Sequence, residues 1–329
     1  MARVFSGIQP SGELHIGNYL GAVQNWVRLQ TQHDCLFSIV DLHAITQPYD
    51  AATLASLTLD MAVSLYAVGL DPDKCIVFVQ SHVAEHTDLN WLLTSVTPLG
   101  ELERQTQFKD KAQRQESVPA GLLAYPILQA ADVLLYKASL VPVGEDQVQH
   151  LELMREIARR WNSRHGHGYF PEPQPLLTTT KRVLGLDGKA KMSKSLGNTI
   201  SLFDSPETIW EKLKPAATDP ARKTRKDPGN PDICNVYTIH HGFSPPETLD
   251  LVARNCRTAG WGCLDCKRVL ADNMIAALTP IRERAAELRA NPSRVRDTLR
   301  RGAAAARALA RRTMAEVRRR MGLLEGAEA

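Results

Sequence analysis

Three stretches of this sequence that contain or adjoin glycine carry residues that can bind phosphate or ribose groups. The first, His15-Ile16-Gly17-Asn18, follows the run SGIQPSG. Glycine lets a backbone pass close to a ligand, and the unpaired N–H groups at a helix start, expected here near Gly17 and Asn18, attract phosphate. His15 could donate to a phosphate oxygen, with Gln9 and Ser11 as further polar contacts. The same pattern also fits a glycine-rich turn without a ligand.

The second stretch is Lys191–Ser195, with the sequence KMSKS, between Gly188 and Gly197. Two lysines three residues apart in a loop could close over a triphosphate. They would neutralise the charge that moves onto a leaving pyrophosphate. A solvated basic loop is the alternative interpretation.

The third stretch is Gly144-Glu145-Asp146-Gln147, directly after the apolar run VPV. Acidic residues there can cap the following helix or hold a ribose hydroxyl. Upstream, Tyr125, Gln129 and Asp132 follow one another at spacings of four and three, which predicts one shared helix face. An Asp in an apolar helical pattern needs a donor, which an internal group or a ligand could supply.

Four of the six cysteines form the pattern C-x21-C-x6-C-x2-C: Cys234, Cys256, Cys263 and Cys266. Four thiolates can supply all ligands of Zn²⁺ or of an iron–sulfur cluster, and the spacing does not choose between them. Unligated helix cysteines are the third interpretation. Cys35 and Cys75 lie beside apolar strand residues and are expected in the core.

The elements that must position these residues alternate between apolar strand-like runs and helical patterns. We expect strands at 4–5, 36–40, 76–79 and 140–143, and helices at 51–68, 85–95 and 121–136. A further helix, with Glu145 and Asp146 in its first turn, is expected to continue through the amphipathic run 149–161. This order predicts an α/β fold with a parallel sheet, whose ligands bind at the carboxyl ends of the strands. Residues 215–231 read as a mobile surface connection, and the pattern after them is mostly helical.

Composition is that of an ordinary globular protein: 329 residues, 43% hydrophobic and 23% charged. The sequence has neither an apolar run of membrane-spanning length nor a secretory leader, so we expect a cytoplasmic protein without membrane association. Net charge is +4, but residues 267–320 contain 15 Lys and Arg against 5 Asp and Glu. That segment therefore carries about +10 and predicts either a nucleic-acid surface or a solvated helix face.

Taken together, SGIQPSGELHIGN, YPILQAAD, VPVGEDQVQHLEL and KMSKS closely resemble the bacterial tryptophanyl-tRNA synthetases, a family of class I aminoacyl-tRNA synthetases. The resemblance covers essentially the whole chain. It implies a Rossmann-type catalytic domain (1–190) and a mostly helical anticodon-binding domain that starts at the KMSKS loop and contains the four-cysteine site (191–300). It also implies a C-terminal helix that packs back toward the catalytic domain (301–329), and a homodimer.

The activity that the resemblance implies is ligation of L-tryptophan to tRNA(Trp), with ATP and Mg²⁺. Alternatives are a tyrosyl-tRNA synthetase of the same fold, or a paralogue that no longer charges tRNA and acts as an interaction or redox-sensing module. The cysteine spacing resembles that of a subset of the family with a [4Fe-4S] cluster, which favours the cluster over Zn²⁺.

The resemblance also implies roles for individual residues. Charge stabilisation falls to His15, Lys111, Lys191 and Lys194. Contacts with ATP fall to Gln9, Pro10, Ser11, Gly17, Asn18, Gly144, Glu145, Asp146, the backbone near Val183, Lys191, Met192, Ser193, Lys194 and Ser195. The tryptophan pocket falls to Phe5, Gly7, His43, Tyr125, Gln129, Asp132, Val141, Val143 and Gln147, with Asp132 accepting the indole N–H. Many bacterial relatives have methionine in place of Gln129.

Overall fold

The computed structural model describes residues 1–113, 117–144, 147–177 and 183–324, without the side chains of Lys111 and Ser195. The chain folds into two compact units. The first contains residues 1–12, 26–178 and 291–329, and the second contains residues 13–25 and 179–290. Within the described residues, no helix has both the length and the apolar character needed to cross a membrane.

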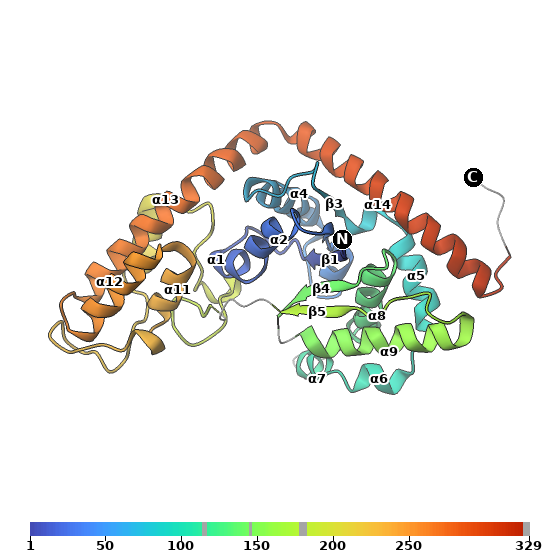
Figure 1. Cartoon of the computed structure of the whole chain (residues 1–329), viewed down its shortest axis with the longest axis horizontal. Helices are drawn as coiled ribbons and strands as arrows, with labels where there is room; N and C mark the ends of the chain where they lie inside the picture. The colour runs from blue at the N-terminus through green and yellow to red at the C-terminus, as the bar shows by residue number, and fades with distance from the viewer. Residues whose placement is uncertain (114–116, 145–146, 178–182, 325–329) are drawn as a thin grey trace. The chain divides into compact units, whose positions relative to one another are not determined.

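The first unit is built on a five-stranded parallel sheet of order β3-β2-β1-β4-β5. Its strands are β1 (Arg3–Ile8), β2 (Asp34–Ile39), β3 (Cys75–Val79), β4 (Leu140–Val143) and β5 (Gln174–Leu177). Figure 1 shows β1, β4 and β5 side by side. The order reverses between β1 and β4, which is where doubly wound sheets bind their ligands. The predicted Rossmann-type parallel sheet is confirmed.

Four of the five strands were predicted, and β5 was not. Its four residues, QPLL, include Pro175, and none of them is buried. A short run with a proline and no buried face gives no strand pattern. Cys35 and Cys75 are buried opposite each other on β2 and β3, as expected for core residues.

The helices of the first unit follow the predicted pattern and add three short ones, α3, α6 and α7. Their bounds are α3 (Asp41–Ala44), α4 (Ala51–Ala67), α5 (Glu85–Thr94), α6 (Leu99–Glu103), α7 (Thr106–Ala112), α8 (Ala120–Leu134), α9 (Val148–His165) and α14 (Pro292–Arg320). A 3-10 turn, η2 (Gln80–His82), follows β3, and α2 (Gln24–Leu29) spans the boundary between the two units in the sequence.

Helix α14 packs along the edge strand β3 and along α5. Its buried residues recur every three or four positions, the spacing of one helix face. They include Ala303, Ala306, Ala310, Met314 and Val317, which belong to the same core as the sheet residues. Gly302 permits the close approach, because a Cβ atom there would lie 2.0 Å from the carbonyl oxygen of Val77. The last helix of the chain therefore covers one edge of the sheet.

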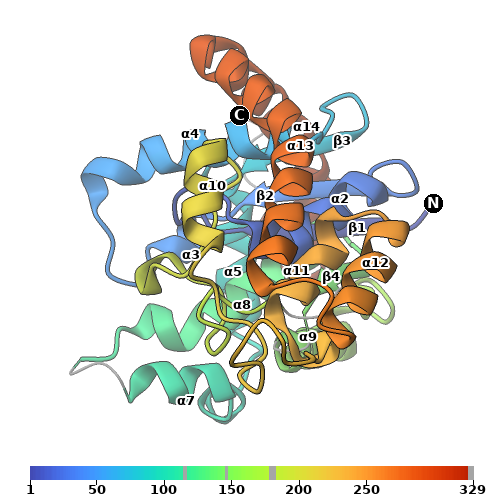
Figure 2. The same ribbon diagram turned by 90° about the vertical axis from the view of Figure 1, so that its left-hand side faces the viewer.

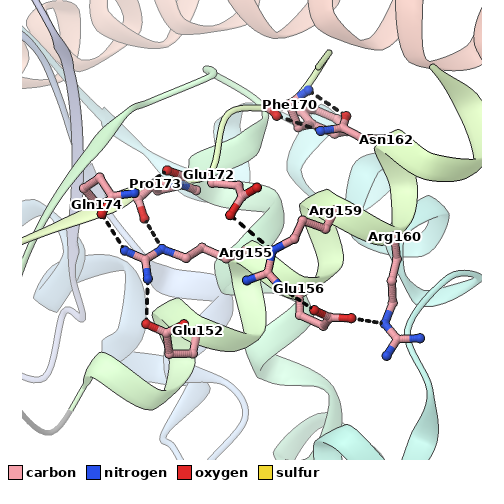
Figure 3. A network of polar contacts seen from close by, with 10 residues as sticks. All are labelled: Glu152, Arg155, Glu156, Arg159, Arg160, Asn162, Phe170, Glu172, Pro173 and Gln174. Atoms are coloured by element: carbon pink, nitrogen blue, oxygen red, sulfur yellow. Dashed lines mark hydrogen bonds and ion pairs between the residues drawn. The ribbon is translucent and has the colours of Figure 1, made fainter. Parts of the chain in front are cut away.

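A polar network fastens α9 to the segment that leads into β5 (Figure 3). Arg155 donates to the carbonyl of Pro173 (2.7 Å) and to the Gln174 side chain (2.7 Å). Asn162 exchanges two hydrogen bonds of 2.9 Å with the backbone of Phe170. These contacts hold the edge strand β5, which has little apolar burial of its own.

The second unit is mostly helical, so the predicted helical C-terminal region is confirmed. Its elements are α1 (Ile16–Asn18), a π-helical turn η1 (Tyr19–Val23), η4 (Lys194–Leu196), α10 (Pro206–Leu213), η5 (Pro231–Ile233), α11 (Asn235–Phe243), α12 (Pro246–Arg257) and α13 (Cys263–Ala290). Helix α13 packs against α10 and α11, and Figure 2 shows α11 beside α12.

Candidate active site

His15 caps the short helix α1 with its own imidazole. Its Nδ1 atom accepts the backbone N–H of Asn18 at 3.3 Å, and the Asn18 side chain lies 3.5 Å from the backbone N of His15. The sequence predicted outward-pointing N–H groups at this helix start. That expectation is wrong for Asn18, because its backbone N–H donates a hydrogen bond to His15 Nδ1.

This cap fixes the chemistry of the imidazole. Since Nδ1 accepts a hydrogen bond, the ring proton lies on Nε2, which remains as a donor. Burial, with the positive charges of Lys194 and Lys191, lowers the pKa of His15 from 6.5 to about 4. His15 is therefore a neutral donor at neutral pH, and two lysine charges act on it.

The loop that contains Lys191 and Lys194 is joined to the His15 turn within the second unit. Ile16 donates to the carbonyl of Ile200 and Leu202 donates to that of Leu14, both at 2.9 Å. A Cβ atom on Gly17 would lie 3.2 Å from the Cβ of Met192, which is buried. The structure thus brings together two motifs that lie about 175 residues apart.

Asn198 holds the loop in shape from inside. Its side-chain oxygen accepts the backbone N–H of Ser193 at 2.8 Å, and its amide donates to Asp187 at 3.2 Å. Gly185 leaves room for this amide, since a Cβ atom there would lie 2.0 Å from Asn198 Nδ2. Burial lowers the pKa of the Lys194 ammonium, while Glu13 opposes that shift.

Asp132 is the centre of a buried polar network in the first unit. Its Oδ2 atom lies 2.9 Å from His43 Nε2. Its Oδ1 atom accepts from Gln80 Nε2 at 2.7 Å and lies 2.7 Å from His86 Nδ1. The other nitrogen of His86 lies 2.8 Å from the hydroxyl of Tyr136. The Asp132 carboxylate, which lies in an apolar stretch of helix α8, therefore has three hydrogen-bond partners within the protein.

The electrostatics of this network favour an ionised carboxylate. Burial by itself raises the pKa of Asp132, but the hydrogen bonds and charges of His43 and His86 outweigh it and hold the pKa at about 2. Burial and the charge of Asp132 raise the pKa of Tyr136 above its ordinary value. Tyr136 therefore stays protonated and can donate to His86.

Tyr125 belongs to a second group of hydrogen-bonded side chains, with His150 and Gln147. Its ring contacts His43, which belongs to the Asp132 network. Its hydroxyl lies 3.0 Å from His150 Nε2, and His150 Nδ1 lies 3.0 Å from the side-chain oxygen of Gln147. The rings of Tyr125 and His43 meet edge to face, with centroids 6.3 Å apart. Three of the residues predicted for the tryptophan pocket, His43, Tyr125 and Asp132, are thus neighbours.

The apolar residues predicted for the tryptophan pocket lie on the central strands β1 and β4. Phe5 stacks on Tyr136 with centroids 5.6 Å apart. Gly7 has no room for a side chain, because a Cβ atom would lie 2.7 Å from Val40 Cγ1. Val141 and Val143 are buried in β4, and Gln129 is half-buried on α8.

Other predicted ATP residues are placed as follows. Gln9, Pro10 and Ser11 follow β1, and Gly144 follows β4, so all four lie at carboxyl ends of strands. Val183 is buried in the second unit. Glu145 and Asp146 lie outside the described residues, as do the side chains of Lys111 and Ser195.

Three members of the Asp132 network were not selected from the sequence: Gln80, His86 and Tyr136. Gln80 directly follows β3 and could have been found by the rule that ligands gather at carboxyl ends of parallel strands. His86 and Tyr136 carried no signal, because a single His or Tyr in a helix is compatible with any buried role.

The four cysteines of the motif line one small cavity in the second unit. Its volume is about 20 Å³, the space of about one water molecule. Burial raises the pKa of Cys266 to about 12, and the charges of Cys234, Cys256 and Cys263 add to that shift. The four cysteine side chains therefore surround one cavity. Nevertheless, in the part of the chain that the structure describes, no group of three or more His, Cys, Asp or Glu could hold a metal ion as placed.

Residues 1–279 match the family model described as class I tRNA synthetases for W and Y. The chain is 56% identical to the tryptophan–tRNA ligase of Deinococcus radiodurans, over 99% of this chain and all of that one. It is 43% identical to the ligase of Thermotoga maritima, over 98% of this chain and 99% of that protein.

Among solved structures, tryptophanyl-tRNA synthetase from Campylobacter jejuni, complexed with ADP and tryptophan, superposes with a TM-score of 0.88 at 36% identity. The match covers 98% of this chain and all of that one. A tyrosyl-tRNA synthetase from Archaeoglobus fulgidus, 23% identical with a TM-score of 0.69, shares the fold. The chain therefore belongs to the class I aminoacyl-tRNA synthetases and, within them, to the bacterial tryptophanyl-tRNA synthetase family.

Proposed function

We propose that this chain activates L-tryptophan with ATP and transfers it to tRNA(Trp). The observation that carries the proposal is the meeting of His15 with the loop of Lys191 and Lys194 within one unit. A neutral N–H donor beside two ammonium groups suits a polyphosphate, whose charge shifts during the reaction.

The reaction has two steps. A carboxylate oxygen of tryptophan attacks the α-phosphorus of ATP in line and forms the adenylate, while pyrophosphate leaves. The 2′-hydroxyl of the terminal tRNA adenosine then attacks the acyl carbon, and AMP leaves. Mg²⁺ would neutralise phosphate charge. The chain's own contribution is positioning and charge stabilisation by His15, Lys191, Lys194 and Lys111.

Asp132 is our candidate for recognition of the indole N–H. An ionised carboxylate offers about four lone-pair sites, and His43, Gln80 and His86 use three. Since two of these donors share Oδ1, the remaining site is on Oδ2. Phenylalanine has no N–H, so it would leave that site unpaired at a cost of roughly 1 to 3 kcal/mol.

ATP–pyrophosphate exchange with tryptophan, with tyrosine and without amino acid tests the proposal. Exchange that depends on tryptophan supports it. Exchange with tyrosine would favour the tyrosyl enzyme, and no exchange at all would favour a paralogue that has lost the chemistry. Asp132→Asn should then lose discrimination against tyrosine and phenylalanine, and unchanged discrimination would remove Asp132 from recognition.

We propose that the basic segment 267–320 contacts tRNA. Some of its arginines, however, already form hydrogen bonds or ion pairs within the first unit. On α14, Arg307 bonds the carbonyl of His82, Arg311 pairs with Glu85 at 3.5 Å, and Arg318 pairs with Asp88 at 3.0 Å. Exposed Arg296 makes no such contact with the described residues.

Salt dependence separates these two groups of arginines. If Arg296 contacts an RNA phosphate, Arg296→Gln should reduce the slope of log affinity against log salt concentration by about one unit. Arg311→Gln, the matched control, should leave that slope unchanged. A flat salt dependence of wild-type binding would reject the basic segment as the tRNA surface.

We also propose that the four cysteines of the motif hold a [4Fe-4S] cluster, with Zn²⁺ as the alternative. The donor set supports this, since four thiols surround one cavity. The cavity is too small for a cluster as it stands, so the side chains would have to turn outward. Such a group would tie α11, α12 and α13 together around the cysteines.

Elemental analysis of anaerobically purified protein distinguishes the metals. About four iron atoms per chain with visible absorbance support the cluster, whereas one zinc atom without colour supports the alternative. Cys266→Ser should lose the metal, and the matched variant Cys75→Ala, outside the motif, should keep it. A metal-free wild type would reject both.

The remaining proposals concern assembly and location. A homodimer and a cytoplasmic location follow from the family resemblance. Light scattering of the full chain at micromolar concentration tests the first, and a monomeric mass would reject it.

A further inference from the structure

A second cavity lies in the first unit, at the edge of the sheet opposite the candidate tryptophan residues. Its volume is about 280 Å³. Its walls come from the start of β1, the turn before β4, Tyr169 and helix α14. Parallel sheets bind the ligands of their main site at the carboxyl edge, whereas this cavity opens at the amino edge. None of the tryptophan-pocket candidates lines it, and Tyr136 is the one lining residue that also belongs to the Asp132 network.

The cavity wall is positively charged. Arg3, Lys137 and Arg312 line it, and none of the described residues in its wall is acidic. Arg3 is already engaged by Asp34 at 2.7 Å and by the carbonyl of Tyr136 at 3.0 Å. Arg312 has no hydrogen bond or ion pair with any described residue. A guanidinium of this kind has its planar set of N–H donors available to an anion.

Lys137 stands in a backbone position that usually belongs to glycine. Its φ is +51°, in the left-handed region. The N–H of Ala138 bonds to the carbonyl of Val133, and the N–H of Lys137 bonds to that of Leu134, the pair of bonds typical of a Schellman helix end. A lysine there is more strained than a glycine would be, and such strain tends to persist at functional sites.

The side chain of Lys137 is held over the cavity wall. Its Nζ atom lies 3.6 Å from the centroid of the Tyr169 ring. The Tyr169 hydroxyl in turn donates to the carbonyl of Thr313 at 3.1 Å, next to Arg312. Glu316, the carboxylate that attracts Lys137, is bonded to Arg319 and Arg320. Lys137 and Arg312 thus face one cavity from opposite elements.

We propose that this cavity binds the phosphate group of a small phosphorylated molecule. Arg312 supplies a planar fork of donors, Lys137 supplies a compact charge, and both are suited to a phosphate dianion. The volume lies just below the range of roughly 300 to 1,000 Å³ that holds drug-sized ligands. It therefore suits a phosphate ester of a small metabolite.

Calorimetric titration of the full chain with inorganic phosphate and with glycerol 3-phosphate tests the site. We expect wild type to bind, and Arg312→Gln and Lys137→Gly each to raise Kd roughly tenfold. Lys137→Gly suits the test because glycine accepts the left-handed backbone. Arg312→Lys should retain part of the binding, and circular dichroism checks that each variant is folded.

Two matched variants locate the bound phosphate. Arg296→Gln removes a charge from the same helix outside the cavity, and Lys194→Ala removes one from the KMSKS loop. Both should leave the cavity affinity unchanged. Binding lost in Lys194→Ala but kept in Arg312→Gln would overturn the proposal, and so would no binding by wild type up to about 10 mM. A raised KM for tRNA in Arg312→Gln with unchanged phosphate binding would assign the cations to RNA instead and would also overturn it.

Discussion

The Nδ1 atom of His86 lies 2.7 Å from Oδ1 of Asp132, and both side chains are buried. His86 is fixed in turn by the Tyr136 hydroxyl, 2.8 Å from its Nε2 atom. In the tautomer that donates to Asp132, Nε2 accepts from that hydroxyl. The imidazole therefore sets the orientation of the carboxylate that we assign to indole recognition.

Replacing His86 tests this positioning role. His86→Leu removes a donor to a buried charge and should cost about 2 kcal/mol of folding stability. It should also raise the KM for tryptophan more than it lowers kcat. His86→Asn is the matched control, since its amide can reach the place of Nδ1, and it should retain most of the affinity. If His86→Leu and His86→Asn had the same KM for tryptophan, the hydrogen bond from His86 would have no role in positioning Asp132.

Acid stability should respond to the same carboxylate. The pKa of Asp132 is about 2 in the folded chain and 3.8 in the unfolded reference, so its contribution to stability is complete above about pH 4. It is lost as the pH falls toward about 2. In His86→Leu the folded pKa should be higher, because one of the hydrogen bonds that lower it is gone. The loss of stability should therefore be smaller and should end at a higher pH than in wild type. Urea unfolding from pH 2 to 6 measures this, and superimposable pH profiles would contradict it.

Lys194→Ala should affect turnover and spare tryptophan binding. Under the proposed role, the ammonium stabilises charge on the leaving pyrophosphate, so kcat of the exchange reaction should fall roughly 100-fold or more. The KM for tryptophan should change little. Lys189→Ala, an exposed lysine two residues before Lys191, serves as the control. Near wild-type exchange by Lys194→Ala would reject its role.

His15 should remain neutral through the physiological range. Its folded pKa of about 4 lies below the unfolded value of 6.5, so its stabilising contribution is present above about pH 6.5 and fades between pH 6.5 and 4. NMR titration of the His15 ring should show no transition between pH 6 and 8 in the free protein. ATP should raise this pKa, because phosphate charge favours the imidazolium. A free-protein transition near pH 6.5 would contradict the arrangement.

The sequence predicted those parts of the structure that depend on local patterns. Apolar runs and helical periods located β1 to β4, α4, α5 and α8 within a few residues. The buried strands β2 and β3 are continuous apolar runs, and the helices carry apolar patterns longer than a strand. Strand β5 was missed since Pro175 and its partly exposed residues give no period. The Asp132 network was also missed, because Gln80 and His86 lie 52 and 46 residues away and no local rule joins them.

The spacing of Tyr125, Gln129 and Asp132 was informative about the helix face but not about partners. Tyr125 and Asp132 do lie on α8, yet their hydrogen bonds go to different residues: Tyr125 to Gln107 and His150, and Asp132 to its own three donors. Side chains on one helix face can point to separate polar groups. Only the packing of the neighbouring elements decides which group each one meets.

The close packing of helix α14 against strand β3 leads to a further prediction. A Cβ atom on Gly302 would lie 2.0 Å from the backbone oxygen of Val77, far inside any real contact. Gly302→Ala should therefore push the helix off the edge strand and lower stability by about 1 to 3 kcal/mol, despite alanine's better helix propensity. Gly100→Ala, in α6, has its nearest contact at 3.7 Å and should be neutral or stabilising. Urea unfolding of both variants measures the difference, and a Gly302→Ala protein as stable as wild type would mean that α14 does not need this close approach.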